Sequence, residues 1–189
     1  MPVMLKISTC LSFFFLLSEL ILLVTKHSGK KESSRQKDKG SLIVLWIIIA
    51  IGLTFGFMLA KYDEWHLVNY LIATAGIIMV LVGLAFRWTA IFQLKKAFTV
   101  DVSISSDQEL KRDGLYRIIR HPSYLGLLLF MTGEAITMNT LVSFIIVFVP
   151  ICLAILYRIN IEEKLLEEFF GNTYRNYKLN TWRIIPFIY

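Results

Sequence analysis

Long apolar blocks are the feature of this sequence that most restricts its fold. Three of them, residues 5–25, 41–60 and 67–86, each consist of about twenty mainly apolar residues, the length of helix that spans the hydrocarbon core of a bilayer. Overall, 56% of the residues are hydrophobic and 18% are charged, whereas soluble domains have about 45–50% and about 25%. This balance excludes an ordinary soluble domain and a disordered chain, and it predicts a membrane protein.

A fourth apolar block, Ser123–Tyr157, is 35 residues long and contains no Lys, Arg or Asp. It is too long for one spanning helix and just long enough for two short ones, with Met138-Asn139-Thr140 as the turn between them. The predicted fold is therefore an all-α integral membrane protein with five transmembrane helices, of which the last two, 123–138 and 141–157, form a helical hairpin. Residues 1–189 make a single domain that ends in a cytoplasmic C-terminal helical segment.

The basic residues between the blocks predict the orientation of the chain. Cytoplasmic loops carry an excess of Lys and Arg, and 18 of the 20 basic residues fall in three segments, 26–40, 87–122 and 158–189. We therefore expect a multi-pass protein whose N-terminus lies outside and whose C-terminus lies in the cytoplasm. The basic residues behind the net charge of +6 lie between the apolar blocks and do not form one patch. We therefore expect membrane lipids and no nucleic acid among the partners of the protein.

Motifs for metal-dependent or triad chemistry are absent from the sequence. Cys10 and Cys152 lie in predicted spans without paired spacing, and the three histidines are scattered, so we expect neither a disulfide nor a metal site. Glu19 and Glu134 are acids inside predicted spans. An ionisable group there is either functional, or it is hydrogen-bonded to a neighbouring helix or extends to the membrane interface.

The segment that precedes the fourth apolar block carries a dense set of polar residues. Gly114 is suited to a turn conformation that other residues avoid, and Pro122 is suited to the first turn of the helix. This arrangement places Arg120 and His121 at a helix N-terminus, where free N–H groups and the helix dipole attract anions. The alternative is a basic membrane-interface anchor with the neighbouring tyrosines as aromatic belt residues.

The fifth span continues into a second polar segment. With helical spacing, Arg158 and Glu162 share one face, and Gly171 is a suitable C-terminal cap. One interpretation is a surface helix with an ordinary Arg158–Glu162 ion pair. The other is a site at the cytoplasmic surface where the polar end of an amphiphilic substrate meets a soluble cosubstrate.

In these two segments the sequence resembles the isoprenylcysteine carboxyl methyltransferase family, within a wider group of membrane methyltransferases that includes the phospholipid N-methyltransferases. The resemblance covers about residues 100–189, and five spans are typical of the short prokaryotic members. The matching features, in order along the chain, are Gly114-x-Tyr116, Arg120-His121-Pro122-Ser123-Tyr124-x-Gly126, Arg158, Glu162-Glu163, Phe169-Phe170-Gly171-x-x-Tyr174-x-x-Tyr177 and Pro186.

The resemblance implies methyl transfer from S-adenosylmethionine to the carboxylate of a lipophilic substrate, ideally a C-terminal prenylcysteine. The cofactor and catalytic region is then 100–189, with Arg158 as the catalytic residue that holds the substrate carboxylate. Asp101 aligns with one further position that contacts the cofactor. The residues that would bind the cofactor are Gln108, Lys111, Tyr116, His121, Pro122, Ser123, Tyr124 and Glu162.

Elementary chemistry agrees with this reaction. A sulfonium methyl group is already activated, and a carboxylate with a pKa near ~4 is ionised at neutral pH. In-line transfer therefore needs positioning and the exclusion of water but no general base. Glu162 is suited to the ribose hydroxyls or ammonium of the cofactor, His121 to its carboxylate, and Arg158 to a bidentate pair with the acceptor carboxylate.

Other functions fit parts of the same pattern. Sterol-reductase-like NADPH enzymes resemble the C-terminal half, and a phospholipid amine or small thiol acceptor would need a base, which His121 could supply. A non-enzymatic membrane scaffold is the third alternative. The short five-span form favours a prokaryotic inner membrane over the endoplasmic reticulum, and the sequence carries no signal for the oligomeric state.

Overall fold

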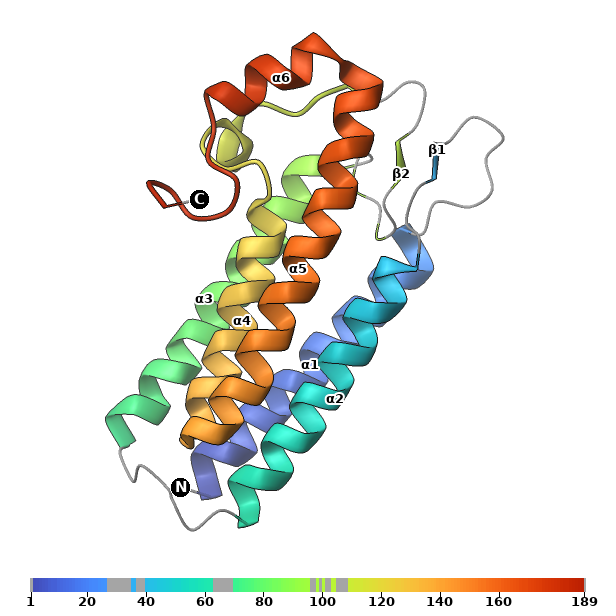
Figure 1. Ribbon diagram of the computed structural model, residues 1–189. Helices are drawn as coiled ribbons and strands as arrows, with labels where there is room; N and C mark the ends of the chain where they lie inside the picture. Colours follow the sequence, from blue (N-terminus) through green and yellow to red (C-terminus); the bar gives the residue numbers. More distant parts are fainter. Residues whose placement is uncertain are drawn as a thin grey trace.

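Helices make up nearly all the regular structure of the computed structural model (Figure 1). The structure describes residues 2–26, 35–36, 40–62, 70–95, 98, 100, 103–104 and 109–188. Two short strands pair antiparallel, with Arg35 opposite Ile104. In chain order, the elements are α1 (Pro2–Lys26), β1 (Arg35–Gln36), α2 (Ser41–Tyr62), α3 (Tyr70–Leu94), β2 (Ser103–Ile104), the 3-10 helix η2 (Gly114–Arg117), α4 (Pro122–Thr137), α5 (Leu141–Phe170) and α6 (Asn172–Leu179).

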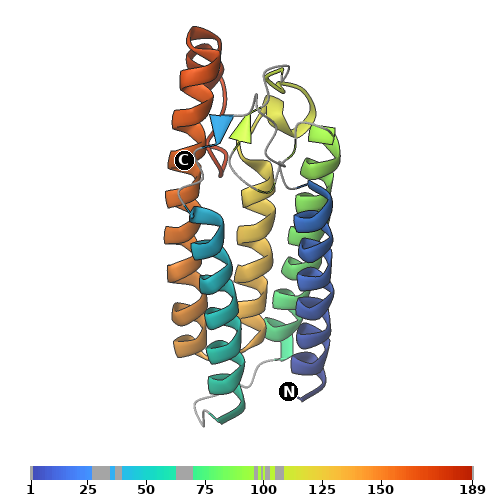
Figure 2. The ribbon, with the colours of Figure 1, turned by 90° about the vertical axis from the view of Figure 1, so that its right-hand side faces the viewer.

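The five long helices run side by side as one bundle in both views (Figures 1 and 2). Helix α3 packs chiefly on α4, and α5 packs on both α2 and α4. Helix α1 lies against α3 and α4 with a smaller contact. Helix α6 and the C-terminal tail cover one end of the bundle, beyond the start of α4 (Figure 1).

Among the described residues, four helices are long and apolar enough to cross a membrane: α1 from Val3, α2, α3 and α5. Helix α4 has 16 residues, so the predicted count of five spans stays a prediction. Helix α5 has 30 residues, or about 45 Å at the rise of an α-helix. That length exceeds the roughly 30 Å of hydrocarbon in a bilayer, so its C-terminal part extends past the apolar layer.

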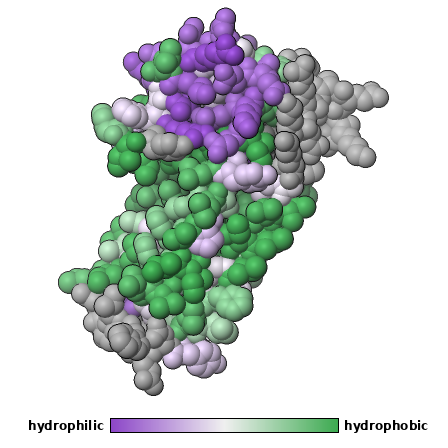
Figure 3. Space-filling view, viewed as in Figure 1, coloured by the Kyte–Doolittle hydropathy of each residue, from purple (hydrophilic) through white to green (hydrophobic). Residues whose placement is uncertain are grey.

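The surface of the bundle divides into an apolar shaft and a polar end (Figure 3). Large hydrophobic side chains are exposed along the shaft, such as Phe13 on α1, Ile43 on α2 and Leu81 on α3. Such a broad exposed apolar surface is unfavourable in water and typical of contact with lipid. The structure therefore supports the predicted multi-pass membrane protein.

Two helix boundaries test the sequence predictions most clearly. Helix α3 continues to Leu94, beyond residue 86, where the predicted third span ends. Arg87 does not end the helix, since its charge is neutralised by Glu19 of α1. The turn between α4 and α5 lies at 138–140, where the side chain of Thr140 caps α5 by accepting a hydrogen bond from Ser143 N at 3.1 Å.

Glu134 lies near the end of α4 but does not reach the surface. Its side chain is fully buried and accepts a hydrogen bond from the Ser8 hydroxyl of α1. The acid therefore joins two helices, as one of the interpretations of its position in a span predicted.

Glycines bring the backbones of α3 and α4 into direct contact. A Cβ atom at Gly133 would lie 2.6 Å from both Gly76 O and Val80 N, and one at Gly83 would lie 2.8 Å from Gly126 O. Because lipid supplies no hydrophobic force between helices, such close packing of small residues is what stabilises their association. The α3–α4 pair is the most tightly packed part of the bundle.

We expect Gly133→Ala to destabilise the protein by about 1–3 kcal/mol, because the added methyl group meets rigid backbone atoms of α3. The matched control is Gly52→Ala on α2, where the new Cβ would meet Val147 Cα at an ordinary 3.8 Å. Since alanine favours a helix over glycine, the control should keep or raise stability. Unfolding in detergent would measure both, and equal effects would contradict the tight interface.

Candidate active site

A pocket lies at the polar end of the bundle, among residues of all six α-helices. It encloses an empty volume of about 1200 Å³, part of which is open to solvent. The lining comes from the C-terminal halves of α1 and α3, the first turns of α2 and α4, the end of α5, and α6. The predicted site residues that line it are Lys111, Tyr116, His121, Ser123, Tyr124, Arg158 and Glu162.

Two further predicted residues differ from this set. Pro122 is the buried first residue of α4 and is not among the lining residues. Its ring sets the start of the helix, where no amide donor is needed. Gln108 lies outside the described residues, as does Asp101.

The approach to α4 is fixed by a backbone pairing between residues 62 positions apart in the sequence. Gly114 has a φ of 58° and begins η2, after which the chain runs beside the C-terminal tail. Arg120 N donates to Trp182 O at 2.8 Å, and His121 N donates to Arg183 O at 3.2 Å. The tail therefore holds the backbone of His121 at the N-terminus of α4.

Glu163 is the centre of a buried charge network behind the pocket. Its Oε1 lies 3.0 Å from Arg120 Nε and 3.3 Å from His121 Nε2, and its Oε2 lies 3.0 Å from Arg183 Nη2. Arg120 also donates to the carbonyl oxygens of Lys178 and Thr181. One carboxylate thus joins α5, the segment before α4 and the C-terminal tail.

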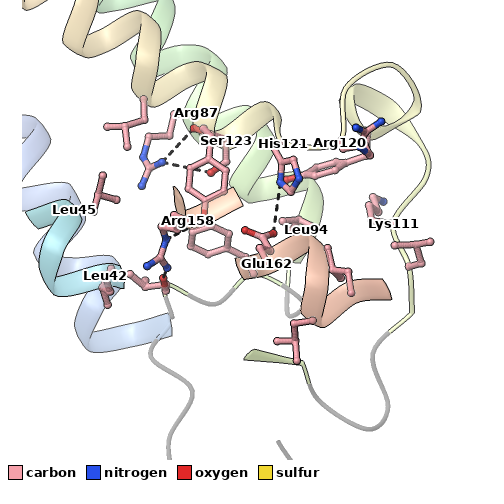
Figure 4. A pocket seen from close by; sticks show the side chains of 18 of the residues that line it. Leu42, Leu45, Arg87, Leu94, Lys111, Arg120, His121, Ser123, Arg158 and Glu162 are labelled. Atoms are coloured by element: carbon pink, nitrogen blue, oxygen red, sulfur yellow. Dashed lines mark hydrogen bonds and ion pairs between the residues drawn. The ribbon is translucent and has the colours of Figure 1, made fainter. Parts of the chain in front are cut away.

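His121 lies between two neighbouring glutamates, and Figure 4 shows its contact with Glu162. Its Nδ1 is 3.7 Å from Glu162 Oε1, on the side opposite its contact with Glu163. The His121 side chain is only 2% exposed, whereas that of Glu162 is 32% exposed. Glu163 therefore anchors the imidazole from behind, and Glu162 offers a carboxylate to whatever occupies the pocket.

Arg158 forms part of the pocket wall on α5. Its Nε donates to the Tyr124 hydroxyl at 2.9 Å, and its Nη1 donates to Ser41 Oγ at 3.0 Å. Its Nη2 donates to the carbonyl of Val100. These contacts hold the plane of a buried guanidinium between α2, α4 and α5, so that its position in the pocket is defined.

Arg87 is a pocket residue that the sequence prediction missed. Its Nε and Nη2 donate to the Glu19 carboxylate at 2.5 and 2.7 Å, and its Nη1 donates to Ser123 O at 3.2 Å. Both charged side chains are buried. The pair attaches α1 to α3 and α4, and it also answers the question that the sequence raised about Glu19. A basic residue inside an apolar helix was the available signal.

Two tyrosine hydroxyls in the lining are paired with backbone carbonyls. Tyr116 donates to Ala90 O at 3.3 Å, and Tyr177 donates to Tyr116 O at 2.5 Å. Burial raises the pKa of both phenols well above their ordinary value. Both hydroxyls therefore stay protonated and act as hydrogen-bond donors at neutral pH.

The lower part of the pocket is apolar. Phe15 of α1, Leu127 of α4, and Leu45, Trp46 and Ile49 of α2 line it. The pocket therefore combines a charged upper region with an apolar region that reaches down the shaft, which suits an amphiphilic ligand.

Comparisons with known proteins agree with this architecture. The family model described as the isoprenylcysteine carboxyl methyltransferase (ICMT) family matches residues 76–168. Protein-S-isoprenylcysteine O-methyltransferase A of Arabidopsis thaliana is 29% identical over 180 residues, which cover 93% of this chain and 89% of that protein. The Saccharomyces cerevisiae protein-S-isoprenylcysteine O-methyltransferase is 31% identical over 137 residues, 71% of this chain and 57% of that protein.

A solved structure also matches. It is described as the eukaryotic intramembrane Ras methyltransferase ICMT, and it superposes with a TM-score of 0.58 at 29% identity. The match covers 78% of this chain and 51% of that chain, so this protein spans about half of it. This chain belongs to the ICMT family. The segment matched by the ICMT family model includes Arg87, His121, Arg158, Glu162 and Glu163.

We expect Glu163→Ala to destabilise this ICMT family member by about 3 kcal/mol, because it leaves Arg120 and Arg183 without their buried carboxylate. Glu167→Ala is the matched control on the same helix. Glu167 pairs with Arg175 and Lys178 in exposed positions, so its loss should matter much less. Denaturant unfolding in detergent would compare the variants, and similar losses would contradict the central place of Glu163.

Proposed function

We propose that this protein transfers a methyl group from S-adenosylmethionine to the carboxylate of a lipophilic substrate such as a C-terminal prenylcysteine. The observation that carries this proposal is the lining of the pocket. A charged region and an apolar region meet there at buried Arg158. The names of the relatives, protein-S-isoprenylcysteine O-methyltransferases, support the same reaction.

The residues of the charged region fit S-adenosylmethionine by the chemistry of their donors and acceptors. Glu162 is a partly exposed carboxylate suited to an ammonium or to ribose hydroxyls. His121 and the first N–H groups of α4 suit a carboxylate. Tyr116 and Tyr124 provide aromatic faces for a sulfonium or an adenine ring. When bound, the cofactor would supply a methyl group that is already activated by its positive sulfur.

The acceptor carboxylate would be held by Arg158. An arginine fork matches a carboxylate with two parallel hydrogen bonds, and the contacts with Tyr124 and Ser41 fix the fork in place. The carboxylate is already ionised at neutral pH, so the protein needs to orient it and to exclude water. The proposed reaction is direct in-line transfer.

The apolar region would receive the lipid tail of the substrate. Helices α1 and α2 both contribute to this region, through Phe15 on one side and Leu45 and Ile49 on the other. Large apolar side chains cover the outside of both helices, so a tail lying in the bilayer would reach the pocket without crossing water.

The membrane arrangement is part of this proposal. We infer five spans, with α4 and α5 as a hairpin, the N-terminus outside and the pocket on the cytoplasmic side, where Lys and Arg gather. The similar proteins named above are eukaryotic, so the prokaryotic inner membrane stays a prediction from chain length.

The direct test is methylation of a farnesylcysteine analogue by the purified protein with methyl-labelled S-adenosylmethionine. We expect a base-labile methyl ester that forms only when the acceptor carboxylate is free. Transfer to a phospholipid amine or a thiol instead would replace the proposed acceptor. Binding of NADPH in place of S-adenosylhomocysteine would contradict methyl transfer and favour a reductase.

We expect Arg158→Lys to lower kcat/KM for the acceptor by about 100-fold, because an ammonium lacks the planar fork. The affinity for S-adenosylhomocysteine, measured by calorimetry, should change by less than about threefold. Arg175→Lys, on the exposed face of α6, is the matched control and should behave as wild type. Equal losses of acceptor use and cofactor affinity would remove Arg158 from this role.

We expect Glu162→Ala to weaken the binding of S-adenosylhomocysteine by about 10–100-fold, the usual loss for one charged hydrogen bond. Glu168→Ala is the matched control, since Glu168 is exposed on the same helix and is not among the pocket residues. Unchanged affinity in Glu162→Ala would place this carboxylate outside the cofactor site.

A further inference from the structure

Tyr174 of α6 lines the pocket and is fully buried, with 0% of its surface exposed. Its hydroxyl has no hydrogen-bond partner among the residues that the structure describes. Buried side-chain hydroxyls are nearly always hydrogen-bonded, and a buried hydroxyl without a partner calls for an explanation. Because this one belongs to a pocket, a ligand is the natural partner.

The neighbouring Tyr177 shows what a structural tyrosine looks like at this place. It also lines the pocket, one helical turn further along α6, with its ring centroid 5.9 Å from that of Tyr174. Its hydroxyl donates to Tyr116 O at 2.5 Å. Both residues are tyrosines of α6 that line the pocket. Among the described residues, the Tyr177 hydroxyl has a hydrogen-bond partner and the Tyr174 hydroxyl has none.

The electrostatic surroundings make the Tyr174 hydroxyl a donor. Burial, together with the negative charges of Glu163 and Glu162, raises the pKa of Tyr174 well above its ordinary value. The phenol is therefore neutral at physiological pH and keeps its proton. Tyr174 and Glu162 both line the pocket, so this donor belongs to the same pocket as the carboxylate assigned to the cofactor.

Hydrogen bonds to the segment before α4 hold helix α6, which follows α5, beside the pocket, so Tyr174 is fixed in the pocket. Gly171, with a φ of 56°, turns the chain between the two helices. The Tyr177 hydroxyl of α6 then donates to Tyr116 O at 2.5 Å, and Arg120 Nη1 donates to Lys178 O at 3.1 Å. A donor on such a fixed element is preorganised for a ligand that binds beside it.

We propose that the Tyr174 hydroxyl donates a hydrogen bond to S-adenosylmethionine, at an oxygen or nitrogen acceptor that the product S-adenosylhomocysteine also carries. The inference rests on the proposed function, since it names the cofactor of that reaction. It adds α6 to the cofactor site and gives Tyr174 a binding role. Tyr174 binds the cofactor, whereas Tyr177 stabilises the fold.

The test compares Tyr174→Phe with Tyr177→Phe in the full-length protein. Without ligand, Tyr174→Phe should unfold at the wild-type temperature or higher, because it removes a buried hydroxyl that has no partner. Tyr177→Phe should unfold at a lower temperature, because it leaves the Tyr116 carbonyl unpaired. Calorimetry with S-adenosylhomocysteine should then show about tenfold weaker binding to Tyr174→Phe than to wild type.

Each other outcome has a definite meaning. If wild type binds S-adenosylhomocysteine and Tyr174→Phe binds it equally well, the hydroxyl contacts only water, and the inference is wrong while the proposed function stands. If wild type does not bind S-adenosylhomocysteine, the proposed function fails and the inference with it. A loss of stability in ligand-free Tyr174→Phe as large as that in Tyr177→Phe would show that the hydroxyl already has a protein partner, which contradicts the inference.

Discussion

The buried carboxylate of Glu163 is the group on which the polar end of the molecule depends. Two guanidinium groups, Arg120 and Arg183, meet at this carboxylate together with His121. So many donors are stable in a buried place only because one anion lies among them. The same contact closes the C-terminal tail over α5 and sets the imidazole in the pocket wall. Stability and the candidate active site therefore share one residue, and the tail is a part of the site.

Much of the fold could be predicted because lipid makes the relation between sequence and structure simple. The lengths of the apolar blocks predicted α1 and α2. Pro122 marked the start of α4, and Gly171 marked the end of α5. The end of α3 could not be read in this way. A charged residue in an apolar helix ordinarily marks its boundary, but Arg87 is neutralised by Glu19, 68 residues earlier. The close packing of α3 on α4 likewise depends on which glycines of the two helices face each other. A single sequence does not show which glycines these are.

The candidate site could be predicted only where its residues are neighbours in sequence. His121, Ser123 and Tyr124 follow one another at a helix start, and Arg158 and Glu162 lie one helical turn apart, so local structure predicted each of these two groups. That both groups belong to one site was implied by the family resemblance. The different roles of Glu162 and Glu163 could not be predicted, because Glu163 is paired with Arg120 and Arg183 from two other segments. The pairing of Arg120 and His121 with Trp182 and Arg183 was also missed, since a backbone contact across 62 residues leaves no pattern in the side chains.

We propose that the pocket at the polar end of the bundle binds S-adenosylmethionine next to an apolar region for a lipid tail. An experimentally determined structure of the complex with S-adenosylhomocysteine tests it most directly. The account predicts that the ligand lies between His121, Glu162 and Tyr174, with its sulfur facing the side of the pocket that holds Arg158. A ligand bound elsewhere, with this pocket empty, would contradict the account.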